Sequence, residues 1–378
     1  MVVEETGGNL IIRRSVNVLE RIYVEPTNAC NLTCVTCVRN IWQEQPGWMS
    51  GETFQRFLEG LRLWDTRPTI FFGGFGEPLS HPDILEMIAA ARHFGAPVEL
   101  ITNGILLEPQ LAARLLELGV RTVWVSLDGV NPDSYQDIRL GGYLEPVLDN
   151  LRAFKILRTQ QPGCETQLGI SFVAMRRNIS DLPDLLKLGG ELGAKKINVT
   201  NLLAHNPDMH IETLYDKIQA ETRQIPDLEL ARLDASENVL RIVQGMVKSG
   251  VQISISGVVS QTEQRACPFL EKASVSIRWD GAVSPCLGLL HTHTAYLGDR
   301  VRQSLAFTVG NVKDADLRSL WMQPDFVELR ERLQLFDYSP CVYCNTCEMS
   351  EKNLEDCFGN RQPACGGCLW AQGLITCP

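Results

Sequence analysis

Residues 21–37 read RIYVEPTNACNLTCVTC, a short apolar run followed at once by a loop that holds three cysteines. The run RIYV has the length and the aromatic and β-branched content of a buried strand. Cys30, Cys34 and Cys37 lie close together in a long chain without the features of a secretory leader, where grouped thiols usually bind metal rather than form disulfides. Iron–sulfur clusters normally take four cysteines, so a triad with no evident fourth partner predicts a cluster with one iron open to another ligand.

From this stretch onward, short β-type runs alternate with amphipathic segments that have helical periodicity. Alternation of this kind predicts a parallel sheet with helices outside it, and six units are too few for a complete eightfold barrel. We therefore expect an α/β fold built as a partial (β/α)6 barrel. The expected strands are residues 21–26, 69–74, 98–104, 122–129, 167–175 and 196–203, and the expected helices are residues 52–63, 83–94, 109–119, 143–158 and 182–193.

The composition and the periodicity of the sequence change near residue 260. Residues 205–250 read as helices and residues 251–257 as a further strand, whereas from Cys267 onward helical periodicity fades and cysteine and glycine dominate. Residues 273–286, ASVSIRWDGAVSPC, predict a β-hairpin that turns at Asp280 and Gly281. We predict two domains, residues 1–260 and 261–378, and expect bound metal to supply much of the stability of the second.

Composition excludes several classes of protein. The net charge of −10 argues against a nucleic-acid partner, because a phosphate-binding surface needs a basic excess. No run of about 18 apolar residues is present to span a membrane. We therefore expect a cytoplasmic protein, in a reducing compartment where its thirteen cysteines stay available as metal ligands.

The carboxyl ends of the predicted strands carry the residues that could bind a small molecule, as expected for a parallel barrel. The second strand ends in GGFGEP (73–78), whose glycines allow a ligand close to the main chain. The third ends in TNG (102–104), the fourth ends in SLDG (126–129), and an arginine that could pair with a ligand carboxylate follows. The candidate binding residues are Gly73, Gly74, Gly76, Glu77, Asn103, Ser126, Asp128 and Arg139.

These motifs together resemble the radical S-adenosylmethionine (SAM) superfamily: the CX3CX2C loop after the first strand, GGFGEP after the second and SLDG after the fourth. The tail resembles the SPASM extension found in members that modify peptides and proteins. More narrowly, EPTNACNLTC (25–34), CVYCNTCEMSEKNLEDC (341–357) and CGGCLWAQGLITCP (365–378) look like the maturases of tungsten-cofactor oxidoreductases. The resemblance covers roughly residues 18–378.

The resemblance implies a 4Fe-4S cluster on Cys30, Cys34 and Cys37 and the reductive cleavage of SAM to a 5′-deoxyadenosyl radical. Gly74 and Glu77 would contact the methionine amino end of SAM. Ser126, Asp128 and Asn103 would face its ribose, and Arg139 its carboxylate. The residue before the third cysteine is usually aromatic in the superfamily, whereas here it is Thr36. The implied partners are a protein, peptide or cofactor substrate and an electron donor such as ferredoxin or flavodoxin.

For the tail, the resemblance implies two auxiliary iron–sulfur clusters. The order of cysteines along a SPASM domain would place Cys267, Cys286 and Cys368 on one cluster. Cys347 or Cys357 would be the fourth ligand of that cluster. The second cluster would take Cys341, Cys344, Cys365 and Cys377. The usual short gap after the CX2C pair is replaced here by an insertion that holds Cys347 and Cys357.

Each interpretation has a simpler alternative. Cys341, Cys344, Cys347 and Cys357 alone could form a zinc site. The paired glycines could serve only as turns, and Ser126 and Asp128 could cap a helix. At the level of function, the alternatives are a peptide-modifying enzyme that forms thioether or carbon–carbon bonds, a ferredoxin-like electron carrier and a zinc-stabilised interaction module. Cys164 is expected to be unligated, and His205, His291 and His293 are assigned no role.

Overall fold

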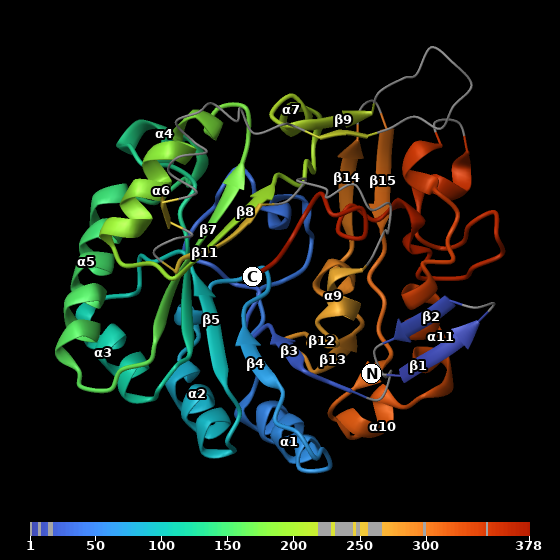
Figure 1. The fold of residues 1–378 in the computed structure, drawn as a ribbon, viewed down its shortest axis with the longest axis horizontal. Coiled ribbons are helices and arrows are strands. Elements are labelled where there is room, and N and C mark those ends of the chain that lie inside the picture. The colour runs from blue at the N-terminus through green and yellow to red at the C-terminus, as the bar shows by residue number, and fades with distance from the viewer. Residues whose placement is uncertain are drawn as a thin grey trace.

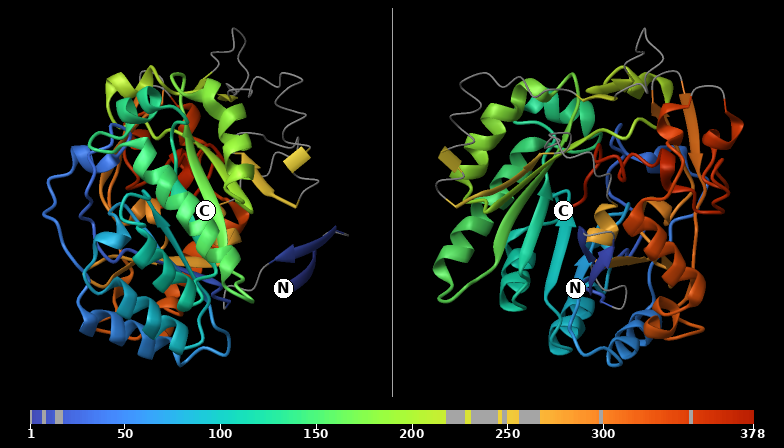
Figure 2. Two further views of the ribbon diagram at one scale, coloured as in Figure 1. Left: turned by 90° about the vertical axis from the view of Figure 1, so that its left-hand side faces the viewer. Right: turned by 45° about the vertical axis from the view of Figure 1, so that its right-hand side comes forward.

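The structure is a computed structural model (Figures 1 and 2). It describes residues 2–6, 9–13, 18–217, 228–230, 245–246, 250–255, 267–297, 300–344 and 347–378. A curved sheet with helices on its outer face forms one half of the molecule, and the cysteine-rich tail packs along the other.

Within the described residues the main sheet has ten strands in the order β11-β8-β7-β6-β5-β4-β3-β12-β13-β16. All neighbours from β11 to β12 pair parallel, and β13 and β16 add antiparallel strands at one edge. The six predicted barrel strands are confirmed and stand in chain order. The strands are β3 Arg21–Val24, β4 Thr69–Phe72, β5 Val98–Thr102, β6 Thr122–Ser126, β7 Gln167–Ala174, β8 Lys196–Asn201, β11 Gln252–Ile255, β12 Ser274–Ile277, β13 Ala282–Ser284 and β16 Gly310–Asn311.

Helices cover the outer face of the barrel strands (Figure 1). In α1 the apolar side chains Phe54, Phe57, Leu58 and Leu61 recur at helical spacing and are buried, and the Ser50 side chain caps the helix by accepting a hydrogen bond from the Thr53 N–H. The five predicted helices are confirmed, and α4 was not predicted. The barrel helices are α1 Gly51–Leu61, α2 Ile84–His93, α3 Pro109–Glu117, α4 Pro132–Ile138, α5 Leu144–Gln160 and α6 Leu182–Glu191.

The helical prediction for residues 205–250 is wrong in part. Among its described residues, α7 is a single turn, and two short strands follow it and pair antiparallel. The remaining elements are α7 Pro207–His210, β9 Tyr215–Lys217, β10 Leu228–Leu230, α9 Pro268–Glu271, β14 His293–Leu297, β15 Arg300–Ser304, α10 Leu317–Trp321 and α11 Pro324–Leu335, with the hairpin β1 Val2–Thr6 and β2 Asn9–Arg13. The 3-10 turns are η1 Val38–Ile41, η2 Pro78–Ser80, η3 Ile179–Asp181, η4 Leu287–Leu289, η5 Cys341–Tyr343, η6 Glu348–Glu351 and η7 Cys365–Gly367.

The tail enters the main sheet directly beside the first barrel strand. Strand β12 pairs parallel with β3, and the Glu25 N–H donates to the Ile277 carbonyl at 2.9 Å. The predicted hairpin is confirmed, since β12 and β13 pair antiparallel around a turn in which Gly281 has φ +91°. The predicted domain boundary at residue 260 lies outside the described residues and stays a prediction.

Residues 374–378 lie across the open side of the barrel, between its first and sixth strands. The side-chain amide of Asn201 on β8 donates to the Leu374 carbonyl at 2.9 Å. Arg21 and Tyr23 on β3 both donate to the Pro378 carbonyl at 3.1 Å. This segment therefore links the first and sixth barrel strands through their side chains.

Candidate active site

A cavity of about 300 Å³ opens at the carboxyl ends of the barrel strands. Parallel strands bring their ends to the same edge, so residues at the ends of all six barrel strands meet there. It collects nearly all the residues predicted from the sequence: Cys30, Cys34, Cys37, Gly74, Gly76, Glu77, Asn103, Ser126, Asp128 and Arg139. Gly73 does not line the cavity; a side chain there would meet Phe71 and Ile101 beneath it.

The cysteine loop is fixed to the barrel by main-chain hydrogen bonds. The Val35 N–H donates to the carbonyl of Ile138 at the end of α4, at 2.9 Å. The Cys37 N–H donates to the Cys34 carbonyl at 3.0 Å, which turns the second and third thiols toward the cavity. The Leu32 N–H donates to the Cys30 sulfur at 3.4 Å, and hydrogen bonds of this kind tune the reduction potential of iron–sulfur clusters.

Burial dominates the electrostatics of the second and third thiols of the triad. Burial raises the pKa of Cys34 to about 11, and burial also raises the pKa of Cys37. Such thiols are protonated and unreactive by themselves, and a cluster that binds them displaces the protons. Three soft donors beside an open cavity therefore fit a 4Fe-4S cluster with one iron facing the cavity.

The GGFGEP loop depends on glycine at two positions. Gly74 has φ +124°, and a side chain there would meet Glu25. At Gly76 a Cβ atom would clash with the main-chain carbonyls of Thr27 and Ala29. Glycine therefore lets this loop pack against the chain that leads into the cysteine triad.

Glu77 joins two strand-end loops. Its carboxylate is buried and accepts hydrogen bonds from the Asn103 N–H at 2.7 Å and the Leu79 N–H at 3.0 Å. Burial raises the pKa of Glu77, although these hydrogen bonds oppose the shift. Its contact with the amino group of SAM stays a prediction, while its support of the Asn103 loop is a role that the sequence did not indicate.

Asp128 and Arg139 form a buried ion pair at the cavity wall. The guanidinium donates to the carboxylate at 2.7 Å, and the second carboxylate oxygen accepts the Val173 N–H at 3.0 Å. Although burial alone would lower the pKa of Arg139, Asp128 raises it. The capping alternative for Ser126 and Asp128 is wrong, because Asn131 caps α4.

His291 lies between two carboxylates that sequence reasoning did not connect with it. Its ring nitrogens lie 2.8 Å from a Glu25 oxygen and 2.7 Å from a Glu44 oxygen, and the indole of Trp42 stacks on the ring at 4.2 Å. Burial lowers the pKa of His291, but the two glutamates outweigh burial and raise it above its ordinary value. Because the second oxygen of Glu25 accepts the Phe75 N–H, this group connects the tail to the GGFGEP loop.

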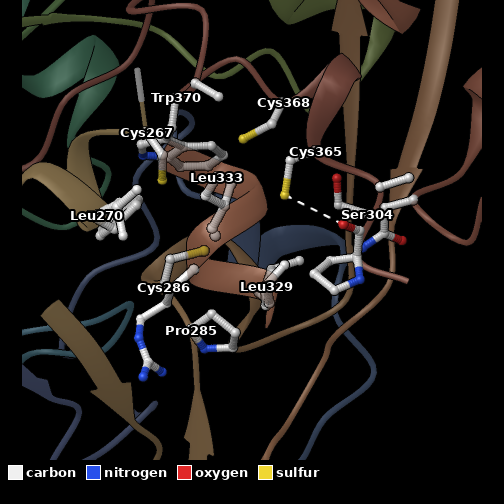
Figure 3. Close-up of a pocket in the computed structure, with 18 of the residues that line it drawn as sticks. Cys267, Leu270, Pro285, Cys286, Ser304, Leu329, Leu333, Cys365, Cys368 and Trp370 are labelled. Carbon is white, nitrogen blue, oxygen red and sulfur yellow. Dashed lines mark hydrogen bonds between the residues drawn. The ribbon is translucent and has the colours of Figure 1, made fainter. Parts of the chain in front are cut away.

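The tail cysteines fall into different environments. Cys267, Cys286, Cys365 and Cys368 line one cavity (Figure 3). Cys341 is buried, Cys347 and Cys357 are exposed, and Cys377 lies in the segment across the barrel opening. Among the described residues, no three His, Cys, Asp or Glu side chains converge as ligands of a single metal ion. An iron–sulfur cluster does not require such convergence, because each thiolate binds its own iron atom.

Comparison with known families agrees with this geometry. Residues 24–161 match the radical SAM superfamily, and residues 267–348 match SPASM, an iron–sulfur cluster-binding domain. The chain therefore carries a radical SAM domain followed by a SPASM domain. It is therefore an enzyme whose cofactors are SAM, a 4Fe-4S cluster and auxiliary iron–sulfur clusters.

Two proteins of this class match most of the chain. The chain is 29% identical, over 95% of its length and 97% of the relative, to a tungsten-containing aldehyde ferredoxin oxidoreductase cofactor-modifying protein of Pyrococcus furiosus. It is 25% identical to an AdoMet-dependent heme synthase of Methanosarcina barkeri, over 82% of this chain and 84% of that protein.

Solved structures share the fold. Streptococcus suis SuiB bound to its precursor peptide SuiA matches with a TM-score of 0.61 at 15% identity, covering 87% of this chain and 70% of SuiB. The AdoMet-bound anSMEcpe matches with a TM-score of 0.58 at 17% identity, over 95% and 91% of the two chains. The predicted α/β partial barrel with a cysteine-rich tail is confirmed.

Proposed function

We propose that the protein is a radical SAM maturase that modifies a tungsten-dependent oxidoreductase or its cofactor. The observation that supports this proposal most is that the cysteine triad, the glycine loop and the Asp128–Arg139 pair all line one cavity. Likeness to the Pyrococcus furiosus cofactor-modifying protein over nearly the whole of both chains supports the substrate class.

The residues of the cavity then have separate tasks. Cys30, Cys34 and Cys37 would hold the cluster, which with bound SAM supplies a radical able to abstract hydrogen from a substrate. Gly74 and Gly76 let the glycine loop pack against Glu25 and the Thr27 and Ala29 carbonyls, and so hold its main chain at the cavity wall, where the methionine end of SAM would approach it. Arg139 offers a buried cation to the SAM carboxylate, while Asp128 keeps that cation oriented.

The rest of the cavity limits access of water. Ile101, Val173, Leu203 and Ile375 line it with apolar surface, and Thr200 and Asn201 add polar groups from β8. Apolar walls protect reactive carbon species from side reactions with solvent. Trp370 reaches the same cavity from the tail, so the SPASM domain contributes to the surface that a substrate would meet.

The location and electron donor are part of the proposal. The described part of the chain contains no helix long and apolar enough to cross a membrane. We place the enzyme in the cytoplasm, where ferredoxin or flavodoxin would supply its electrons.

SAM cleavage tests the reaction. Replacing Cys30, Cys34 and Cys37 together by alanine should abolish 5′-deoxyadenosine formation under dithionite while leaving the iron of the tail bound. Cys164→Ala is the matched control, since Cys164 lines neither cavity, and it should retain cleavage. Cleavage by the triple variant at the parent rate would contradict the assignment.

A substrate experiment tests the maturase role. The reduced enzyme is incubated with SAM and either a tungsten-free aldehyde oxidoreductase, its isolated cofactor or a short cysteine-rich peptide. We expect 5′-deoxyadenosine formation to rise with the oxidoreductase or the cofactor. Stimulation by the peptide alone, with a mass change in the peptide, would replace the proposal by peptide modification.

A further inference from the structure

Four tail cysteines from three separate segments face one cavity (Figure 3). Cys267 comes directly before α9, Cys286 follows β13, and Cys365 and Cys368 lie at the start and just past the end of η7. The Cys368 N–H donates to the Cys365 carbonyl at 3.0 Å, so one tight turn presents both of its thiols. In Figure 3 the four sulfur atoms surround the same space.

Two buried arginines, Arg302 and Arg330, line the same cavity. Arg302 donates hydrogen bonds to the carbonyls of Ser350 and Ala364. Arg330 is only 3% exposed, and its Nε and Nη1 atoms have no hydrogen-bond partner among the described residues. Its third nitrogen, Nη2, donates to the Trp321 carbonyl at 2.8 Å, and the buried charge of Arg330 has no ion-pair partner among the described residues. Burial lowers the pKa of Arg330 to about 10. A negatively charged group in the cavity would compensate that charge, and an iron–sulfur cluster bound by four thiolates is such a group.

The remaining tail cysteines lie elsewhere. Cys341 lines a separate small cavity beside β14 and β15, and its sulfur lies 3.0 Å from the Ser339 hydroxyl. The Cys344 N–H donates to the Cys341 carbonyl at 3.3 Å, so these two thiols share one turn. Asp356, the residue before Cys357, accepts the Ser339 N–H at 3.0 Å, which ties the insertion to the same turn.

Cys377 belongs to neither neighbourhood. Its carbonyl accepts a hydrogen bond from Lys272 at 2.6 Å, and the next residue is bound by Arg21 and Tyr23 of the barrel. It lines neither the cavity of Figure 3 nor the one beside β14 and β15.

We propose that Cys267, Cys286, Cys365 and Cys368 are the four ligands of one auxiliary iron–sulfur cluster, and that Cys377 is a ligand of none. This differs from the order that the family resemblance implies, in which Cys365 and Cys377 share a second cluster. The insertion that carries Cys347 and Cys357 accounts for the difference, because it supplies two thiols beside Cys341 and Cys344. The assignment does not depend on which substrate the enzyme modifies.

The test compares single alanine variants of the full chain, reconstituted anaerobically with iron and sulfide. The variants are Cys267→Ala, Cys365→Ala, Cys347→Ala, Cys377→Ala and, as matched control, Cys164→Ala. Iron and sulfide per chain are measured, together with the electron paramagnetic resonance spectrum of the dithionite-reduced protein. Neither readout requires turnover. The change that SAM causes in the spectrum of the N-terminal cluster reports whether the barrel of each variant is folded.

We expect Cys365→Ala and Cys267→Ala to alter the same spectral component and to lose up to one cluster, about four iron atoms per chain. Cys377→Ala should keep the iron content and spectrum of Cys164→Ala. Cys347→Ala should alter a different component from Cys267→Ala.

Three results would overturn the assignment. The first is loss of a cluster in Cys377→Ala, and the second is an unchanged spectrum in Cys365→Ala. The third is a change in Cys347→Ala that coincides with the change in Cys267→Ala. If Cys365→Ala also loses the response to SAM, its barrel is not folded, and the conservative Cys365→Ser variant is measured in its place. An altered auxiliary spectrum with a retained SAM response supports the proposal, and an unaltered spectrum overturns it.

Discussion

Arg139 offers a quantitative test of the cavity wall. The Arg139–Asp128 pair is almost fully buried, with side chains 7% and 2% exposed. Replacing the arginine by methionine leaves the carboxylate inside the protein with the Val173 N–H as its remaining donor in the described structure. Removing one member of a buried ion pair costs about 3–5 kcal/mol.

The expected shift in Tm follows from the size of the chain. An unfolding entropy of about 2.1 cal/mol/K per residue gives roughly 0.8 kcal/mol/K for this protein. The loss therefore corresponds to a Tm lower by about 4–6 °C, measured by circular dichroism at one scan rate under anaerobic conditions.

An exposed pair provides the control. Arg152 lies 2.8 Å from Asp149, with side chains 53% and 70% exposed, so Arg152→Met should cost at most about 1 kcal/mol. The double variant Asp128→Asn with Arg139→Met should recover part of the loss, because no unpaired charge remains. The reasoning is refuted if Arg139→Met lowers Tm no more than Arg152→Met does.

Two further changes test the loops beside the cavity. Gly76→Ala should abolish SAM binding in equilibrium dialysis because its Cβ would clash with the Thr27 and Ala29 carbonyls, whereas Gly190→Ala, in an open helical position, should leave binding unchanged. Binding retained by Gly76→Ala would show that the loop can move. The pKa of His291 is raised in the folded protein. The ion pairs of His291 therefore stabilise the fold fully below the ordinary pKa of histidine, and this stabilisation is lost as the pH rises through the raised pKa. Tm should therefore fall over that range in the parent and less in His291→Gln, and equal pH profiles would contradict the ion pairs.

Much of the barrel could be predicted from local sequence. Runs such as TIFF at 69–72 are apolar and bounded by proline and glycine, so strand type and position follow from the chain itself. The gathering of the candidate residues around one cavity could be predicted as well, because parallel strands must present their ends at one edge. Strands β9 and β10 were missed, since a pairing of three residues each leaves too short a pattern.

Contacts between residues that lie far apart in the chain could not be predicted. Nothing in the sequence around His291 indicates that Glu25 and Glu44 will enclose it, because that role depends on burial against two distant loops. Cysteine spacing likewise fixes which thiols are neighbours in the chain but not which distant thiols share a cavity. Cys365 therefore could be placed with Cys267 and Cys286 only once the tail had a structure.

The pairing of β12 with β3 has a consequence during synthesis. Strand β3 leaves the ribosome early, yet the residues that complete one of its edges follow about 250 positions later. At about 5–20 residues per second, that edge waits roughly 12–50 s for its partner. An apolar strand with a free edge is prone to pair with other chains, so the nascent protein is most exposed to aggregation during this interval.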